Sequence, residues 1–235
     1  MDDITPALLA EIQKTFGAKV KASNKLKRLL ETVKSGKATY LDANDFAIEL
    51  GDLLAQTFGE LITPDKLPDG KMYFNIANRI LNSTLKKNYK SVIGYTNIVQ
   101  SGLNRAANIH LKNQVPRLNQ NRIDGFINKI STAEKFEDVT WVLQDPIVNF
   151  TQSVVDDAID VNANFQTKAG LNPMITRKVF GHGCDWCRNL AGTYDYRDKP
   201  VDIYRRHQRC RCTVEYNPGD GRRQNVWSKK WGKGR

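Results

Sequence analysis

Apolar residues recur at helical spacing through most of the first 170 residues of the chain. Side chains three or four positions apart share one face of an α-helix, so each such stripe predicts a helix with one buried face. We interpret the stripes as core faces and assign none of them a ligand. The stripes are Leu8, Ile12 and Phe16; Leu26, Leu29, Leu30 and Val33; Phe46, Leu50, Leu53, Leu54 and Leu61; Tyr73, Ile76, Ile80 and Leu85; Ile123, Phe126, Ile127 and Ile130; and Ile147, Phe150, Val154, Ala158 and Phe165.

Capping residues and glycines set the expected ends of these helices. Thr5 predicts the start of the first helix and Gly17 its end, because a hydroxyl caps free N–H groups and glycine terminates helices. Asp42 is the expected cap of the third helix. Asp145 is expected to begin the last long helix, and Gly170 to end it.

The pattern changes after residue 170. Residues 175–179, 193–196 and 212–216 alternate between apolar and polar, which predicts half-buried strands. Residues 219–235 have no apolar face to bury, so we expect a flexible or partner-ordered tail. The predicted fold is a mainly α body over residues 1–170, a small α+β Cys/His domain over 171–218 and a basic tail over 219–235.

Charge points to a polyanionic partner. The chain has 235 residues and a net charge of +11, gathered between Lys14 and Lys37 and again after Arg205. Such ends favour nucleic acid or an acidic protein surface, unless the basic side chains are simply solvated. In the tail, flexible spacing and two indoles fit non-specific contact with double-stranded DNA, an acidic protein surface being the rival. The expected contact residues are Arg222, Arg223, Trp227, Lys229, Lys230, Trp231, Lys233 and Arg235.

The sequence also indicates a compartment. The acidic start at Met1 and the short apolar run at residues 8–10 do not fit a secretory signal, and no apolar run reaches membrane-spanning length. We therefore expect a cytosolic chain without a membrane segment. Thiols stay reduced there, which favours metal ligands or free thiols over disulfides.

All the cysteines of the chain lie in one short region, where they carry most of the chemical information. Cys184 and Cys187 form C-x-x-C, and His207, Cys210 and Cys212 form H-x-x-C-x-C. Sulfur and imidazole donors at such spacing can close around one tetrahedral zinc ion. Against zinc, alternating residues on a strand point to opposite faces, which would separate the C-x-C pair. Two readings stay open, a zinc site and a group of buried thiols with a structural histidine.

The same residues carry a resemblance. The order of C-D-W-C at 184–187, L-A-G at 190–192 and H-Q-R-C-R-C at 207–212 resembles the C-terminal domain of phage head-morphogenesis proteins, the family typified by the minor head protein F of phage Mu. The match covers residues 171–218. It departs from the family at residues 204–206, where many members have a proline.

The resemblance implies a minor capsid protein present in few copies near the portal. Its implied partners are the portal and other capsid proteins, and its implied roles are head assembly, DNA delivery and genome ejection. It would then be found in the virion, in the head interior or portal region, and in the host cytoplasm during assembly.

Two other functions compete with this one. A zinc-dependent nuclease could use His182 or His207 beside the cysteines, but the sequence has no His-His or His-Asn dyad at the usual spacing and no carboxylate cluster for magnesium. A zinc-ribbon DNA-binding protein suits the basic tail, but no recognition helix is recognisable. We therefore expect no enzymatic activity and no small-molecule substrate.

Overall fold

A computed structural model describes residues 3–181, 183–207 and 209–219, and the backbone alone of 223–224 and 231–232. The described chain is mainly helical with a small antiparallel sheet near its C-terminal end, which confirms the predicted fold class. In the tail, β4 (Arg223–Gln224) pairs with β5 (Trp231–Gly232). The other predicted tail contacts lie outside the described residues: Arg222, Trp227, Lys229, Lys230, Lys233 and Arg235.

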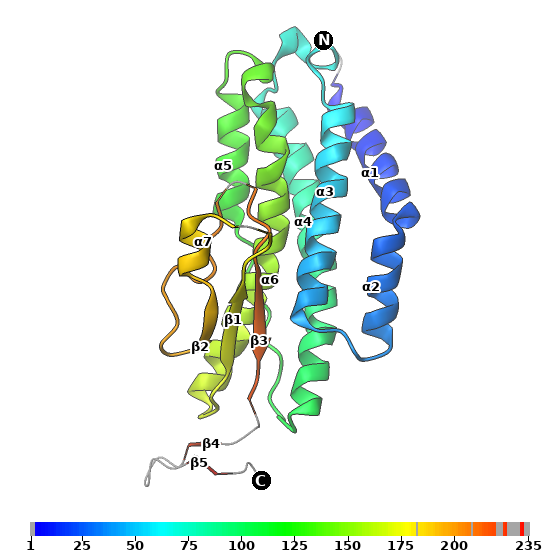
Figure 1. Cartoon of the computed structure of the whole chain (residues 1–235). Coiled ribbons are helices and arrows are strands. Elements are labelled where there is room, and N and C mark those ends of the chain that lie inside the picture. Colours follow the sequence, from blue (N-terminus) through cyan, green and yellow to red (C-terminus); the bar gives the residue numbers. More distant parts are fainter. Residues whose placement is uncertain (1–2, 182, 208, 220–222, 225–230, 233–235) are drawn as a thin grey trace.

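The helices form an elongated bundle in which α3 and α6 run side by side (Figure 1). Helix α3 also packs on α1, α2 and α4, while α5 packs on α4. The α-helices are α1 (Thr5–Ala22), α2 (Asn24–Lys34), α3 (Tyr40–Leu61), α4 (Phe74–Ala106), α5 (Gln120–Ser131), α6 (Asp145–Lys168) and the short α7 (Asp185–Asn189). Three 3₁₀ segments connect them at η1 (Pro64–Lys66), η2 (Pro68–Gly70) and η3 (Phe136–Leu143).

The approach of α3 to α6 depends on one glycine. A Cβ added at Gly51 would lie only 2.8 Å from the Cα of Val148, so a larger residue would force the two backbones apart. Thr151, one turn further along α6, would meet the same Cβ at 3.3 Å. Such close backbone contact fixes the position of α6 relative to α3, and β3 packs against both of these helices.

Three of the expected caps and ends are wrong. Thr5 begins α1 but its hydroxyl does not cap the helix: the N-cap is Ile4, and the Thr5 N–H donates to the Asp3 carboxylate at 3.0 Å. Helix α1 continues through Gly17 and ends at Ala22. The next residue, Ser23, caps α2, and its hydroxyl accepts a hydrogen bond from the N–H of Leu26. Helix α3 is capped by Thr39 rather than by Asp42. The Thr39 N–H donates to the Asp42 carboxylate at 2.8 Å, which completes a reciprocal capping box.

The sheet has the order β2-β1-β3 with antiparallel pairing throughout. Its strands are β1 (Met174–Lys178), β2 (Gly192–Asp195) and β3 (Thr213–Asn217), close to the predicted positions. Arg177 on β1 lies opposite Gly192 on one side and Val214 on the other. Strand β3 contacts both α3 and α6, so the sheet lies against the bundle (Figure 1).

The helices and the sheet share one hydrophobic core. Ile175, Ile203 and Val214 are buried in the same cluster of apolar side chains as the helical stripes. The proposed division at residue 170 into a body and a Cys/His domain stays a prediction, and the shared core joins the two parts. None of the described helices has the length and apolar content needed to cross a membrane.

Candidate metal centre

The predicted cysteines and histidine come together where α7 meets the segment entering β3 (Figure 1). Cys184 is the N-cap of α7, and Cys187 lies inside that helix. His207, Cys210 and Cys212 belong to the irregular segment that precedes β3. We call these five residues the Cys/His cluster.

The cluster consists of two groups that share Cys187. Cys184, Cys187 and His207 form one, and Cys187, Cys210 and Cys212 form the other, each with its donor atoms within 4.8 Å of one another. His207 Nε2 lies 3.3 Å from Cys184 Sγ and 3.1 Å from Cys187 Sγ, while Cys187 Sγ lies 3.9 Å from Cys210 Sγ. Ligands of a tetrahedral zinc ion are about 3.5–3.8 Å apart, so these separations suit a metal.

The expected separation of Cys210 and Cys212 across a strand is wrong. Both residues precede β3, which begins at Thr213, so strand alternation does not apply to them. Arg209 has a positive φ of 59°, and the Cys210 N–H donates to the His207 carbonyl at 3.1 Å. The sulfur atoms of Cys210 and Cys212 both lie within 4.8 Å of the Cys187 sulfur.

The environment of the cluster favours thiolate at particular positions. All four cysteines are free thiols, and three of them are buried. The backbone N–H of Cys187 lowers the pKa of Cys184, while burial raises the pKa of Cys187. The hydrogen bond between the side chains of Cys210 and Cys212 lowers the pKa of Cys212 and raises the pKa of Cys210. Thiolate is the form of cysteine that binds metals, so the lowered pKa values of Cys184 and Cys212 favour metal binding at these two positions.

Helix α6 holds the segment that carries the cluster through polar side chains that sequence reasoning missed. Asn149 donates its amide to the His207 carbonyl at 3.0 Å, and Gln152 donates to the Cys212 carbonyl at 3.0 Å. Asn44 on α3 reaches the Val214 carbonyl at 3.0 Å. Amides at helical spacing within an otherwise apolar face were the signal in the sequence.

A buried ion pair completes this attachment. Arg206 donates to both carboxylate oxygens of Asp156 on α6, at 2.8 and 2.7 Å, and also donates to the Cys212 carbonyl. The two side chains are only 3% and 1% exposed. Nearby, Arg211 pairs with Asp52 and Asp145. Part of the basic charge that the sequence assigns to a polyanion partner is therefore used inside the protein.

The candidate chemistry of the centre follows from these contacts. The two groups contain only cysteine and histidine donors, and together they could hold a metal ion. The indole of Trp186 lies edge-on to the His207 ring, with 6.1 Å between the ring centroids. His182, considered for a nuclease, lies outside the described residues.

Comparisons with protein-family models, with curated proteins and with solved structures find no match for this chain. The Cys/His cluster and its contacts with the bundle are therefore the features from which a function is inferred.

The buried ion pair predicts a large difference between two neighbouring arginines. Arg206→Gln should lower the free energy of unfolding by about 3–5 kcal/mol, because it leaves the buried Asp156 carboxylate without its partner. Arg205→Gln is the control, since Arg205 pairs with Asp202 at the surface and should contribute less than about 1 kcal/mol. Urea unfolding of both variants measures the difference. Equal effects would show that the ion pair does not anchor the segment.

Proposed function

We propose that this chain is a minor head protein of a phage, in which a zinc ion in the Cys/His cluster fastens the C-terminal sheet to the helical bundle. The observation that carries the proposal is the convergence of the C-x-x-C and H-x-x-C-x-C segments, in the order of the phage family, on one group of donors. Attachment to α3 and α6 supports a structural role for this group.

The donor set suits a structural zinc ion better than a catalytic one. Catalytic zinc keeps a coordination position open for water or substrate, whereas structural zinc is closed by four protein ligands. The cluster offers five donors, so protein side chains alone can fill every position. Buried sulfur at Cys187, Cys210 and Cys212 adds to this argument, because those ligands are away from solvent. We therefore infer an assembly role rather than catalysis.

The zinc proposal predicts one equivalent of metal and a special place for Cys187. Cys187→Ser should abolish stoichiometric binding, because Cys187 belongs to both donor groups. His207→Ala and Cys184→Ser should each keep the metal with weaker affinity, since the group of Cys187, Cys210 and Cys212 stays complete, whereas Cys187→Ser leaves neither group complete. Elemental analysis and chelator competition measure these outcomes. Because metal binding and folding are linked, zinc removal should also speed hydrogen exchange in residues 174–217 more than in α1.

Two results would contradict this prediction. Wild-type protein purified without chelators could contain less than about half an equivalent of metal. Alternatively, Cys187→Ser could bind zinc as tightly as His207→Ala, which would show that the two donor groups do not share one ion.

The head-protein proposal predicts that the chain is built into particles. In a phage that encodes it, purified heads should contain a few copies each, and pull-down of the tagged chain should recover the portal protein. Cys187→Ser should reduce incorporation, because the fold that carries the contacts loses its metal. Quantitative mass spectrometry of purified heads measures the copy number. Absence from heads, together with normal particle yield after gene deletion, would rule the role out.

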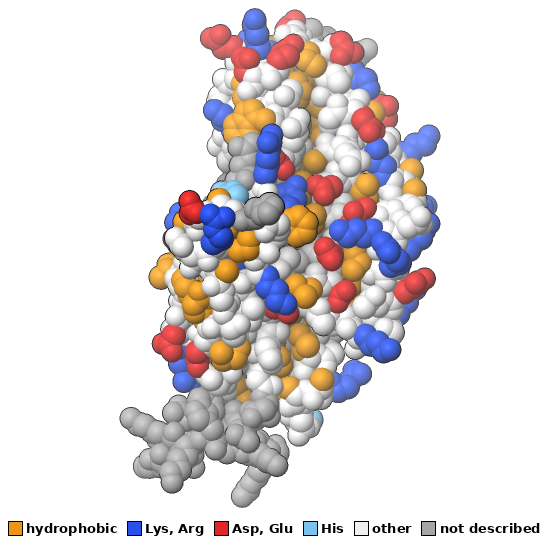
Figure 2. Space-filling view, viewed as in Figure 1, with side chains coloured by type: hydrophobic (Ala, Val, Ile, Leu, Met, Phe, Trp, Pro, Cys, Tyr) orange, Lys and Arg blue, Asp and Glu red, His pale blue; other side chains and the backbone are white. Residues whose placement is uncertain are grey.

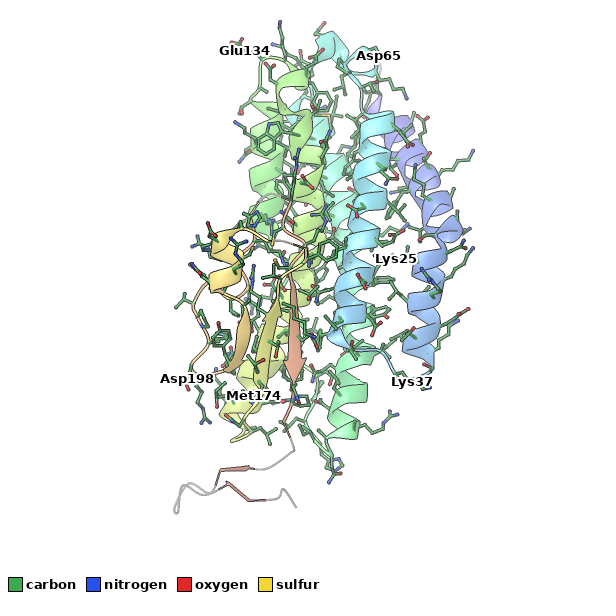
Figure 3. All side chains as sticks on the ribbon, viewed as in Figure 1. Lys25, Lys37, Asp65, Glu134, Met174 and Asp198 are labelled. Atoms are coloured by element: carbon green, nitrogen blue, oxygen red, sulfur yellow. The ribbon has the colours of Figure 1, made fainter. Side chains whose placement is uncertain are left out.

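Non-specific DNA contact is part of the proposal, and the bundle has a basic surface suited to it. Lys27, Arg28 and Lys34 are exposed along α2. Figure 2 shows Lys and Arg side chains along the edge formed by α1 and α2, with carboxylates among them. Lys25 and Lys37 lie on this side too, Lys25 paired with a carboxylate of α3 (Figure 3). Cations spaced along one helix can meet successive phosphates without reading bases.

If this surface binds DNA, the loss of DNA affinity should depend on where positive charges are removed and not only on how many are removed. Replacing Lys27, Arg28 and Lys34 with Gln should weaken duplex DNA binding about tenfold or more and lower the salt slope of log affinity by up to about 3. The control replaces the exposed Lys86, Lys87 and Lys90 of α4 with Gln, which removes the same charge elsewhere. Fluorescence titration at two salt concentrations gives both quantities.

Equal weakening in the two variants would mean that DNA responds to overall charge alone. A version of the chain ending at residue 218, titrated in parallel, tests the tail: unchanged affinity would exclude the tail as a DNA contact.

A further inference from the structure

Arg177 lies on β1 with its guanidinium inside the protein, beside the Cys/His cluster. The residue is 1% exposed. Its Nη2 atom lies 3.9 Å from the sulfur of Cys187 and 3.9 Å from that of Cys210, while Nη1 donates to the Ile203 carbonyl. The guanidinium thus connects both cysteine segments to the loop that follows β2.

A cation in this position needs a negative charge next to it. Arginine keeps its proton in proteins, and a buried charge without a partner is strongly unfavourable. Within the described part of the chain, no carboxylate forms an ion pair with Arg177, and the nearby Asp156 already pairs with Arg206. The Nε atom of Arg177 also has no hydrogen-bond partner among the described residues. Of the hydrogen-bond partners of the guanidinium, only the two sulfur atoms can carry the balancing charge.

A metal supplies that negative charge by displacing the thiol protons. Zinc bound by three thiolates and an imidazole carries a net charge of minus one, and zinc bound by four thiolates carries minus two. A buried anionic complex of this kind is stabilised by a neighbouring cation, just as the buried guanidinium of Arg177 is stabilised by a neighbouring anion. The indole of Trp186 lies 5.4 Å from the guanidinium and provides a further favourable contact for the cation.

We propose that Arg177 is the charge-balancing residue of the metal centre and favours an anionic, thiolate-rich complex at Cys187 and Cys210. This inference rests on the zinc site proposed above. It adds a residue that does not ligate the metal and assigns it to metal affinity. Residues around a metal site commonly change affinity by about 10–100-fold when they are replaced.

The test compares three variants of the full chain. Arg177→Met removes the charge at similar length, and Arg177→Lys keeps the charge but loses the planar fork. Arg122→Met is the control, because Arg122 is a partly buried arginine that contacts Ser153 and the ring of Phe126 rather than sulfur. Chelator competition gives zinc affinity. Absorption of the cobalt-substituted protein reports the number of thiolate ligands.

We expect Arg177→Met to weaken zinc binding about 10–100-fold and to reduce the thiolate-to-cobalt absorption. The zinc affinity of Arg177→Lys should stay within a few-fold of the wild-type value, because this variant keeps the positive charge. Arg122→Met should leave both readouts unchanged, even where it lowers the unfolding midpoint.

Three outcomes would overturn the inference. Wild-type affinity and spectrum in Arg177→Met would show that the charge is not needed, while the zinc site itself would stand. If Arg177→Lys loses as much zinc affinity as Arg177→Met, the effect depends on the shape of the side chain instead of its charge. If Arg177→Met does not fold, the zinc affinity of Arg177→Lys decides the question alone. Absence of metal from the wild-type protein would remove the zinc site and the inference together.

Discussion

The attachment of the C-terminal segment to α6 is the constraint on which the rest of the structure depends. One side of α6 is held against α3 by the close backbone contact at Gly51. Another side offers Asn149, Gln152 and Asp156 to a segment that buries its own backbone carbonyls there. Buried polar groups that lose water must find partners, so the path of residues 206–214 is set by where α6 places its amides and carboxylate. The position of the Cys/His cluster follows from that path.

Helical periodicity predicted most of the fold because burying apolar side chains decides where helices and strands form. The stripes at Leu26 and Ile147 became α2 and α6, and alternation predicted the three strands of the sheet. The errors at Gly17 and Asp42 have a different cause. A glycine costs a helix only about 1 kcal/mol, which flanking contacts outweigh, and a cap depends on the backbone conformation of one residue, which composition does not reveal.

The donors of the site could be predicted from the sequence, but their arrangement could not. Spacing placed Cys184 and Cys187 together, and it gave no reason for Cys210 and Cys212 to point the same way. That depends on the turn at Arg209 and on the register at which β3 begins. The same limit applies to charge. The sequence counts Arg206 and Arg211 as basic surface, whereas their partners lie far away along the chain, on α3 and α6.

These contacts have a consequence for the order in which the protein folds. Cys184 and Cys187 can approach each other locally, because they lie within one turn around α7. Cys210 and Cys212 come from a distant segment, which leads into β3 beside β1 and whose Cys212 carbonyl accepts a hydrogen bond from Gln152 of α6. Arg177 adds to this dependence, because its charge is buried only once the sheet lies against the bundle. A metal ion held by donors from both segments would therefore bind tightly to the completed fold and weakly to its parts. In the proposed head protein, bound metal would thus distinguish a finished subunit, with its sheet fixed to the helices, from one still incompletely folded.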